Sequence, residues 1–475
     1  MFKSKSKNLT EGPIFKSILV LAIPIIFSSL LQTTYNLTDT FWVGRLGAGA
    51  VAAVSLSFPV MFLIFAVGGG LAVAGTILVA QYKGKKDEFS VDHVTSQTFS
   101  MMFIVSILIG IIGYLISPSI ISFIGADAIV NPMAIEYLRV SFLGVLFVFI
   151  YYVFESLMRG VGNAKTPVFI VSATVLLNLV LDPLFIFGWG PFPAMGVSGA
   201  ALATVCTQAL AAIVGVILLF SGRYGLRLKF KSLKPDFPLI RKMFFLGMPS
   251  SIEQSSRALS FVFLTLLAAK FGTIALAAYG IRNRISSFLI LPALGLAVAA
   301  SAIIGQNLGA QKPERAQKTA KAALIATFIS LTTLGMVFFI FAENIIGWFV
   351  PGDLEVIKMG TLFLRITAPT LGLLGIEIVA GGILRGAGAT ASAMTLAVVS
   401  LWVLHIPVAF LLVNYTSLSE VGLWISFAFG NVTGATLGLI LLKKSNWQNK
   451  NLTAKFGSLS TQITDEALVD EGLSA

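Results

Sequence analysis

The chain has 475 residues, of which 56% are hydrophobic and 11% are charged, and its formal net charge is +12. A soluble globular protein carries about 25% charged residues, so this composition excludes a soluble enzyme, a nucleic-acid-binding protein and a disordered chain. The mean hydropathy of +0.91 instead indicates a polytopic membrane protein. The single cysteine, Cys206, has no disulfide partner, and the two histidines lie too far apart in the sequence to suggest a metal cluster.

In chain order, residues 1–13 are basic and polar, and no small-residue cleavage site follows them. We therefore expect a retained cytoplasmic tail, not a signal peptide. A membrane-spanning helix needs about 20 mostly apolar residues, and twelve segments of the chain satisfy this. They are expected near 14–43, 49–80, 94–118, 132–157, 166–188, 196–220, 239–269, 274–305, 317–342, 356–383, 391–413 and 421–442. None alternates in polarity as barrel strands do, so the predicted fold is an all-α membrane protein with twelve transmembrane helices.

The segment 221–238 (SGRYGLRLKFKSLKPDFP) is the most polar stretch between spans, and it divides them into two groups of six. We expect an N-lobe over 14–220, a cytoplasmic linker over 221–238, a C-lobe over 239–443 and a cytoplasmic polar tail over 444–475. With both termini in the cytoplasm, 25 of the 33 Lys and Arg residues fall on the cytoplasmic side, which agrees with the positive-inside rule. The basic residues therefore set the topology beside anionic lipid headgroups.

The two groups of spans repeat each other. A shift of 225 positions places Pro24 on Pro249, and a shift of 226 places MRGVGNA (158–164) on LRGAGAT (384–390). Because each repeat has an even number of spans, both enter the membrane in the same sense, as in transporters built from parallel repeats. We expect the two six-helix lobes to surround a central cleft and to give alternating access by rocking against each other.

Four segments together resemble the multidrug and toxic compound extrusion (MATE) family: IPIIFSSLLQTTYNLTDTFWVGRLG, MRGVGNAKTP, NLVLDPLFIFGWG and MGVSGAALAT. The resemblance covers roughly residues 15–443, keeps the order of the motifs, and is closest to the DinF-like prokaryotic branch. It implies secondary active efflux of organic, often cationic compounds, driven by inward Na+ or H+. The branch couples transport through two aspartates, one after the YN pair of the first span and one before the proline of the fifth. The residues at the matching positions of this branch are Asp39, Asn178, Asp182 and Thr204.

The NorM-like branch of the same family carries acids in its C-terminal lobe, including a glutamate in span seven. This chain departs from that pattern, because Glu253 lies one helical turn nearer Pro249 and Arg257 stands where the acid is expected. The resemblance therefore gives little support for a separate cation site in the C-lobe. Arg284 matches a family arginine, and we expect its role, like that of the neighbouring Arg282, to be structural.

The aspartates also stand out from their chemistry alone. A carboxylate inside a span costs several kcal/mol unless it is neutralised, paired or hydrated, so it is a candidate functional group. Helical spacing places Asp39 on one side of its helix with other polar residues, and Asn178 one turn from Asp182. The candidate cation-coupling residues are Tyr35, Asn36, Asp39, Asn178, Asp182 and Thr204. Pro183 removes a backbone donor and is expected to break or kink the helix beside Asp182.

Such an oxygen-only set suits Na+ as well as protons. The expected coupling ion is H+ or Na+, with Na+ held by Asp39, Asp182 and Asn178, and no cofactor is expected. An alternative interpretation stays open, in which both acids lie at the outer ends of their spans and merely face water.

Other candidates have weaker support. The secondary ionisable residues are Glu253, Glu377, His405 and Arg284, and the candidates for lining a substrate cleft are Gln32, Phe41, Met61 and Phe65. Ordinary same-face ion pairs are expected for Glu253 with Arg257 and for Glu155 with Arg159. His405 is expected to be a packing residue more often than a proton carrier.

The leading hypothesis is a multidrug antiporter of the cell (plasma) membrane, which binds small organic or cationic substrates, contacts the lipid bilayer and no nucleic acid, and acts as a monomer. The alternative is a flippase for lipid-linked oligosaccharides or precursors with the same architecture. Its cleft would need several basic residues at mid-membrane to bind pyrophosphate, and this chain has few there. A membrane-embedded enzyme would need a catalytic set at depth, and the sequence shows none.

Overall fold

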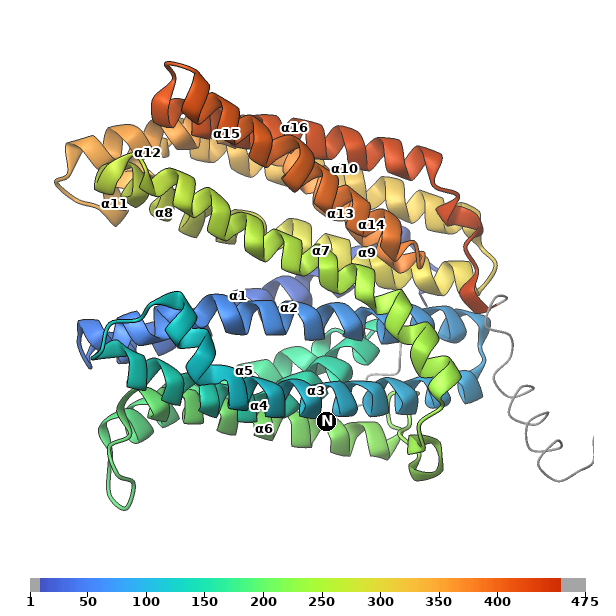
Figure 1. Ribbon diagram of the computed structural model, residues 1–475. Helices are drawn as coiled ribbons and strands as arrows, with labels where there is room; N and C mark the ends of the chain where they lie inside the picture. Colours follow the sequence, from blue (N-terminus) through green and yellow to red (C-terminus); the bar gives the residue numbers. More distant parts are fainter. Residues whose placement is uncertain (1–8, 454–475) are drawn as a thin grey trace, which may run out of the picture. The chain divides into compact units, whose positions relative to one another are not determined.

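The computed structural model describes residues 9–453, apart from the side chain of Asn36. Of the predicted tails, residues 1–8 and 454–475 lie outside the described part. The chain folds into helices in the following order (Figure 1): α1 (Ile14–Gly44), α2 (Ala48–Lys85), α3 (Glu88–Ile124), α4 (Val130–Gly160), α5 (Lys165–Phe187), α6 (Gly196–Ser221), η1 (Phe230–Leu233), α7 (Phe237–Ala269), α8 (Gly272–Leu289), α9 (Leu291–Gly309), α10 (Pro313–Ile340), α11 (Ala342–Phe349), α12 (Leu354–Thr367), η2 (Ala368–Thr370), α13 (Leu371–Gly386), α14 (Thr390–Val398), η3 (Val399–His405), α15 (Ile406–Tyr415), α16 (Ser419–Lys444) and η4 (Trp447–Asn449). The predicted all-α fold class is confirmed.

Eleven helical segments of the described chain are long and apolar enough to cross a membrane. They coincide with eleven of the twelve predicted spans. The remaining span corresponds to α7, a helix of 33 residues. α7 is less apolar than the others because its middle carries Glu253, Gln254 and Arg257.

Three of the predicted spans are interrupted. The span near 274–305 divides into α8 and α9, and Pro292 lies in the first turn of α9. The span near 356–383 passes through the 3-10 turn η2, which contains Pro369. In the span near 391–413, a π-helical segment, η3, precedes Pro407. Proline lacks a backbone N–H and clashes with the preceding turn, and these three prolines follow the points at which the α-helical hydrogen bonding changes.

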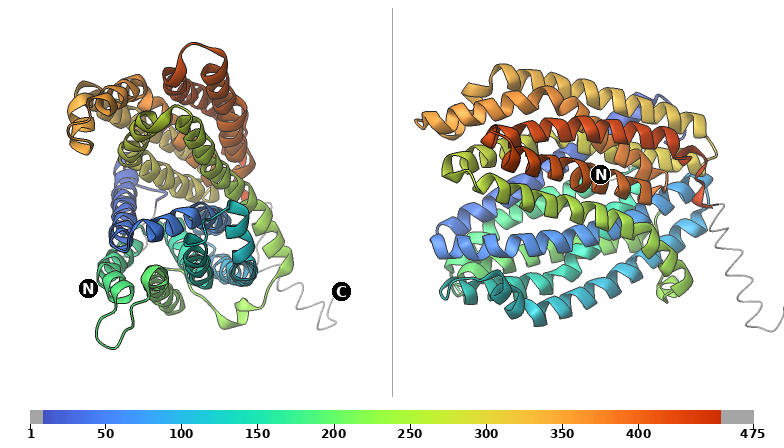
Figure 2. Two further views of the ribbon diagram at one scale, coloured as in Figure 1. Left: turned by 60° about the vertical axis from the view of Figure 1, so that its left-hand side comes forward. Right: turned by 45° about the horizontal axis from the view of Figure 1, so that its top comes forward.

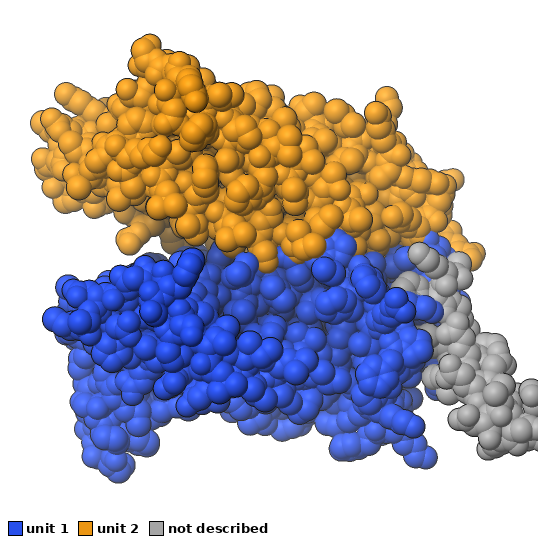
Figure 3. Space-filling model, viewed as in Figure 1, with its two compact units in different colours: residues 1–8, 27–251, 451–475 blue, residues 9–26, 252–450 orange. Residues whose placement is uncertain are grey.

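The chain divides into two compact units, drawn in different colours in Figure 3. Among the described residues, unit 1 comprises 27–251 and 451–453, and unit 2 comprises 9–26 and 252–450. Both changes of unit fall inside a helix, two residues after Pro24 in α1 and two residues after Pro249 in α7. These prolines are equivalent in the repeat. The lobes predicted from the sequence, 14–220 and 239–443, remain a prediction.

Helix α4 forms the centre of unit 1 and packs against α2, α3 and α6 (Figure 2). Three of its phenylalanines are buried, and each faces a glycine of a neighbouring helix: Phe142 faces Gly113, Phe149 faces Gly68, and Phe154 faces Gly215. A Cβ at any of these glycines would overlap the ring. Small residues therefore let the helices of this unit approach closely, as is common in membrane proteins.

Helix α13 has the corresponding place in unit 2 and packs against α9, α10 and α16. A second core of this unit is aromatic. The rings of Phe363 and Trp424 stack with their centroids 3.9 Å apart, and Tyr279 stacks on both. This cluster joins α8, α12 and α16.

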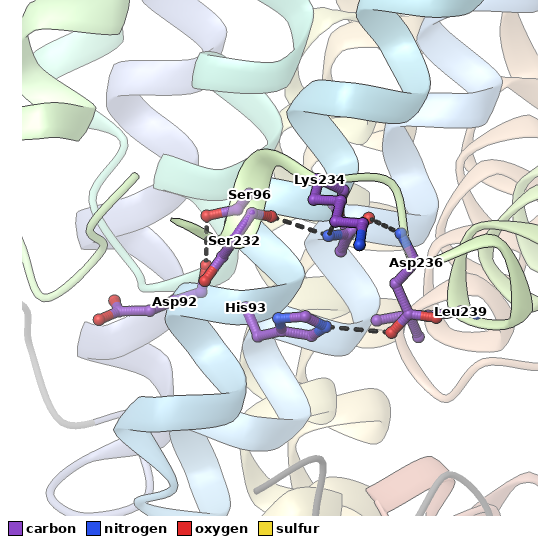
Figure 4. Close-up of polar contacts among 8 residues, drawn as sticks. Asp92, His93, Ser96, Ser232, Lys234, Asp236 and Leu239 are labelled. Carbon is purple, nitrogen blue, oxygen red and sulfur yellow. Dashed lines mark hydrogen bonds and ion pairs between the residues drawn. The ribbon is translucent and has the colours of Figure 1, made fainter. Parts of the chain in front are cut away.

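The linker between α6 and α7 is tied to the beginning of α3 (Figure 4). Lys229 Nζ lies 2.9 Å from Asp92 Oδ2, and His93 Nε2 lies 3.2 Å from Asp236 Oδ2. The buried side chain of Gln97 donates to the carbonyl oxygens of Ser232 and Lys234, both at 2.8 Å. These contacts hold the linker against the N-terminal end of α3.

Asp236 also sets the start of α7. Its Oδ1 accepts a hydrogen bond of 3.0 Å from the backbone N–H of Leu239, which is an N-cap interaction. The hydrogen bond with His93 is the main reason that the pKa of the Asp236 carboxyl lies below its ordinary value. One carboxylate therefore joins the linker, α3 and the first turn of α7.

Two short segments outside the predicted spans pack against helix turns that the repeat makes equivalent, residues 81–82 of α2 and residues 306–307 of α9. The backbone N–H of Leu452 donates to Gln81 Oε1 at 2.8 Å, and Leu452 is buried. In unit 2, Asn307 Nδ2 donates to the carbonyl oxygen of Leu9 at 3.3 Å, and Leu9 is also buried. The residues beside each tail are therefore packed against the unit to which they belong.

Candidate functional site

A polar group inside unit 1 joins α1 to α6. The hydroxyl groups of Tyr35 and Thr207 are 3.1 Å apart, and both side chains are buried. The Thr207 hydroxyl donates to the carbonyl oxygen of Thr204 at 2.8 Å. Because a threonine hydroxyl has one proton, Tyr35 is the donor and Thr207 the acceptor in the first bond.

Helix α5 contributes an amide and a carboxylate to the interior of unit 1. Asn178 Nδ2 donates to Asp182 Oδ1 at 2.8 Å, and both residues are 0% exposed. The other oxygens, Asn178 Oδ1 and Asp182 Oδ2, are buried and have no hydrogen-bond partner. The expected break at Pro183 does not occur, since α5 continues as an α-helix to Phe187.

Asp39 supplies a third oxygen of the same kind. Its side chain is half-buried, and its Oδ1 is buried without a hydrogen-bond partner. The negative charge of Asp39 acts on Asp182, and both charges act on the hydroxyl of Tyr137 in α4. The structure thus brings Asp39, Asn178 and Asp182 into one electrostatic neighbourhood.

These oxygens have the chemistry that a cation site requires. An ionised carboxylate buried without partners is costly, and a proton or a hard metal ion supplies what the oxygens lack. Within residues 9–453, no group of three or more His, Cys, Asp or Glu side chains could hold a metal ion. The candidate set in unit 1 is therefore two carboxylates with one amide.

Thr204 lies in the same polar group as Tyr35, because its carbonyl oxygen accepts from Thr207 and its side chain hydrogen-bonds Tyr35. Of the residues predicted to line a substrate cleft, Gln32 and Phe41 are exposed, Phe65 is half-buried, and Met61 is buried in the core of unit 1. The side chain of Asn36 lies outside the described residues. Sequence reasoning missed Thr207 and Tyr137. Thr207 is three residues after Thr204, so its position on α6 was a usable signal, whereas nothing in the sequence marked Tyr137.

Four charged side chains form a network inside unit 2. Glu253 and Glu377 are 2% and 3% exposed. Arg257 Nη2 lies 3.7 Å from Glu253 Oε1 and 3.4 Å from Glu377 Oε1, and Arg385 also binds Glu253 Oε1. The structure shows the expected ion pair between Glu253 and Arg257 and, in unit 1, the one between Glu155 and Arg159. In addition, Glu377 pairs with Arg257, and Arg385 pairs with Glu253.

The remaining ionisable candidates of unit 2 differ in burial. His405, the last residue of the π-helical segment η3, is buried and lies 3.3 Å from the Ser426 hydroxyl. Its ring meets Phe427 edge-on at 4.9 Å, which fits a packing role. Arg284 is exposed, whereas its neighbour Arg282 is buried.

The coupling candidates of unit 1 have no acidic counterparts in unit 2. A shift of 225 places Asp39 on Leu264. A shift of 224, which aligns Pro183 with Pro407, places Asp182 on Ile406. The two repeats have therefore diverged at these positions.

Comparison with known proteins agrees with the repeat. The sequence profile of the MatE family matches residues 24–184 and again residues 249–411. The two matches begin 225 positions apart, which is the shift that aligns the halves of the chain.

Individual relatives cover almost the whole chain. The probable multidrug resistance protein YoeA of Bacillus subtilis is 28% identical over 89% of this chain and 92% of its own length. A multidrug resistance MATE family transporter of the MOP superfamily, solved in an outward-facing conformation, has a TM-score of 0.86 and 27% identity, over 96% of this chain and 99% of that one. A MOP superfamily transporter of Pyrococcus furiosus, described with a binding pocket of reverse polarity that suggests a different function, has a TM-score of 0.86 and 27% identity, over 94% and 100% of the two chains.

The profile matches, the curated relatives and the solved structures point to the same conclusion as the helical architecture. The protein is a multi-pass membrane transporter and not an enzyme. The chain belongs to the MatE family of multidrug and toxic compound extrusion transporters.

Proposed function

We propose that this protein exports organic, often cationic and lipophilic compounds in exchange for H+ or Na+, coupled through Asp39, Asn178 and Asp182. The observation that carries the proposal is the group of three buried oxygens in unit 1 that lack hydrogen-bond partners. The relatives named as multidrug resistance proteins support the substrate class.

The chemistry of coupling follows from the cost of burying charge. When both carboxylates are ionised and no cation is bound, they repel each other and lack the hydration that they would have in water. A proton or Na+ relieves this cost. The protein then favours one conformation when the ion is bound and the other when it is not. A bound ion shifts the equilibrium between two conformations only as far as it binds one of them more tightly than the other.

The residues around the ion have separate tasks. Asn178 holds one oxygen of Asp182 at 2.8 Å, which leaves the other oxygen available to the ion. Tyr35 anchors α1, which carries Asp39, to Thr207 of α6. A movement of α1 would therefore change the distance between the two carboxylates.

The driving force is sufficient for transport against a gradient. One charge that crosses a potential of 100 mV releases about 2.3 kcal/mol, and one pH unit adds about 1.4 kcal/mol per proton. In this proposal the ion gradient across the membrane supplies the energy for uphill efflux, and a single chain contains the whole coupling site.

The experiment uses purified full-length protein in liposomes loaded with a fluorescent cationic dye. Asp182→Asn and Asp39→Asn should abolish gradient-driven dye transport while the protein stays folded. Glu136→Gln, which changes an exposed acid of α4, is the matched control and should transport normally. Wild-type rates in either aspartate variant would refute the coupling role.

The coupling ion is identified by imposing one gradient at a time. A proton gradient alone and a Na+ gradient alone are applied to the wild-type liposomes, and only the coupling ion should drive dye transport. Dye transport with neither gradient, at the same rate, would refute antiport. Liposomes that contain a fluorescent lipid-linked oligosaccharide test the flippase alternative in the same preparation.

A further inference from the structure

Arg282 of α8 is a buried cation with no acidic partner. The residue is 5% exposed, and within residues 9–453 no carboxylate oxygen lies within ion-pairing distance of it. Its guanidinium carbon lies 4.8 Å from the ring centroid of Phe363 and 4.7 Å from that of Phe427. Cation–π contacts offset part of the cost of burial. The two ring centroids are 5.4 Å apart, so both rings lie on one side of the guanidinium group and supply no hydrogen-bond acceptor.

The charges inside unit 2 do not balance. The two buried acids, Glu253 and Glu377, are already engaged by Arg257 and Arg385. Arg282 is a third arginine and leaves an excess of one positive charge. The titratable side chains on which its charge acts are His405 and Tyr279, and neither is an acid that could pair with it.

The unsatisfied polar groups around Arg282 are hydrogen-bond donors. Arg282 Nε and Asn283 Nδ2 are both buried without a partner. Asn283 Oδ1 accepts a hydrogen bond from Arg282 Nη1 at 3.3 Å, so the amide nitrogen on the same carbon lies beside the guanidinium group.

This pattern is the reverse of that in unit 1, where the unpaired atoms of Asp39, Asn178 and Asp182 are oxygens. Acceptors without donors fit a cation, whereas donors without acceptors, next to an uncompensated positive charge, fit an anion. The two rings cover one side of the guanidinium group, and Arg282 Nε remains able to donate to a ligand.

We propose that Arg282 and Asn283 form a buried site in unit 2 for one small monovalent anion, a halide or a carboxylate. The single excess charge sets the valence, and the burial sets the small size. The site is separate from the coupling site in unit 1 and does not depend on which cation drives transport.

The test measures the thermal stability of the full-length protein in detergent at constant ionic strength, with gluconate replaced stepwise by chloride or by acetate. A ligand that binds only the folded state stabilises it in proportion to ln(1 + [L]/Kd), so the Tm of the wild type should rise by about 2 °C or more. The chloride arm and the acetate arm distinguish an inorganic anion from a carboxylate group. Arg284→Gln, an identical change at an exposed arginine two residues away, should keep the full rise, and Arg282→Gln should lose it.

A wild-type Tm that is the same in gluconate, chloride and acetate would overturn the proposal, and so would an undiminished rise in Arg282→Gln. If Arg282→Gln does not fold, crystals of the wild type grown in bromide decide the question. An anomalous peak within hydrogen-bonding distance of Arg282 Nε supports the site. Peaks found only elsewhere refute it.

Discussion

Replacing Arg385 by glutamine should destabilise the protein far more than the same change at Arg159, although the two arginines are equivalent in the repeat. Arg159 pairs with Glu155 one turn away on its own helix, and the two side chains are 28% and 15% exposed. Arg385 of α13 instead binds Glu253 of α7, whose side chain is 3% exposed. The first pair is local and partly hydrated, whereas the second joins two helices in the interior of unit 2.

The magnitudes follow from burial. Removing one partner of a buried ion pair leaves an uncompensated charge and costs about 3–5 kcal/mol. Arg257 remains 3.7 Å from Glu253 Oε1, so the lower end, about 3 kcal/mol, applies to Arg385→Gln. Pairs four residues apart on one helix contribute about 0.2–0.5 kcal/mol, so Arg159→Gln should cost less than about 1 kcal/mol.

The assay is reversible unfolding of the purified variants in mixed micelles, with the free energy of unfolding as the readout. The double variant Glu253→Gln/Arg385→Gln has no unpaired acid at this position and should recover a large part of the loss. Equal losses for Arg159→Gln and Arg385→Gln would refute the reasoning. A double variant that is less stable than Arg385→Gln alone would refute it as well.

Two further predictions concern packing and pH. A Cβ at Gly434 of α16 would overlap the carboxylate of Glu377, so Gly434→Ala should cost about 1–3 kcal/mol. Gly44→Ala at the end of α1 has open space around it and should be neutral or stabilising by up to about 1 kcal/mol, because alanine favours the helix more than glycine does; equal losses of unfolding free energy would contradict this. Asp236→Asn keeps a capping side chain at the start of α7 but loses the charged bond with His93, and should cost about 1–2 kcal/mol at pH 7. Because His93 lowers the pKa of Asp236, this contribution is fully present above the ordinary aspartate pKa of about 3.9 and is lost as the pH falls through the lowered pKa of the folded protein. A difference in Tm between the two proteins that does not shrink as the pH falls from about 5 to about 2 would contradict the assignment.

Most of the secondary structure could be predicted from the sequence, because the cost of exposing backbone groups to lipid forces each apolar stretch of about 20 residues into a helix. The linker 221–238 was recognisable by its charge. The sequence did not indicate that Asp92, His93 and Gln97 hold this linker, because those contacts join residues more than 130 positions apart.

The interruptions within spans were harder to anticipate. Pro292 and Pro369 accompany breaks in the helices, yet α1, α2 and α5 continue through Pro24, Pro59 and Pro183. A proline in a membrane helix is tolerated when its surroundings satisfy the freed carbonyl. Whether they do so depends on the neighbouring helices, which the local sequence does not specify.

By itself, the sequence determined that this protein is an α-helical membrane protein with two related halves, and it singled out Asp39 and Asp182, because a charge within an apolar span is rare and costly. Only the tertiary structure decided the partners of the buried polar groups. It placed Tyr35 beside Thr207, Arg385 beside Glu253, and Arg282 beside two phenylalanine rings. Helical periodicity shows which side of a helix a residue occupies, whereas the neighbour on that side comes from another helix, and its identity depends on how the helices pack.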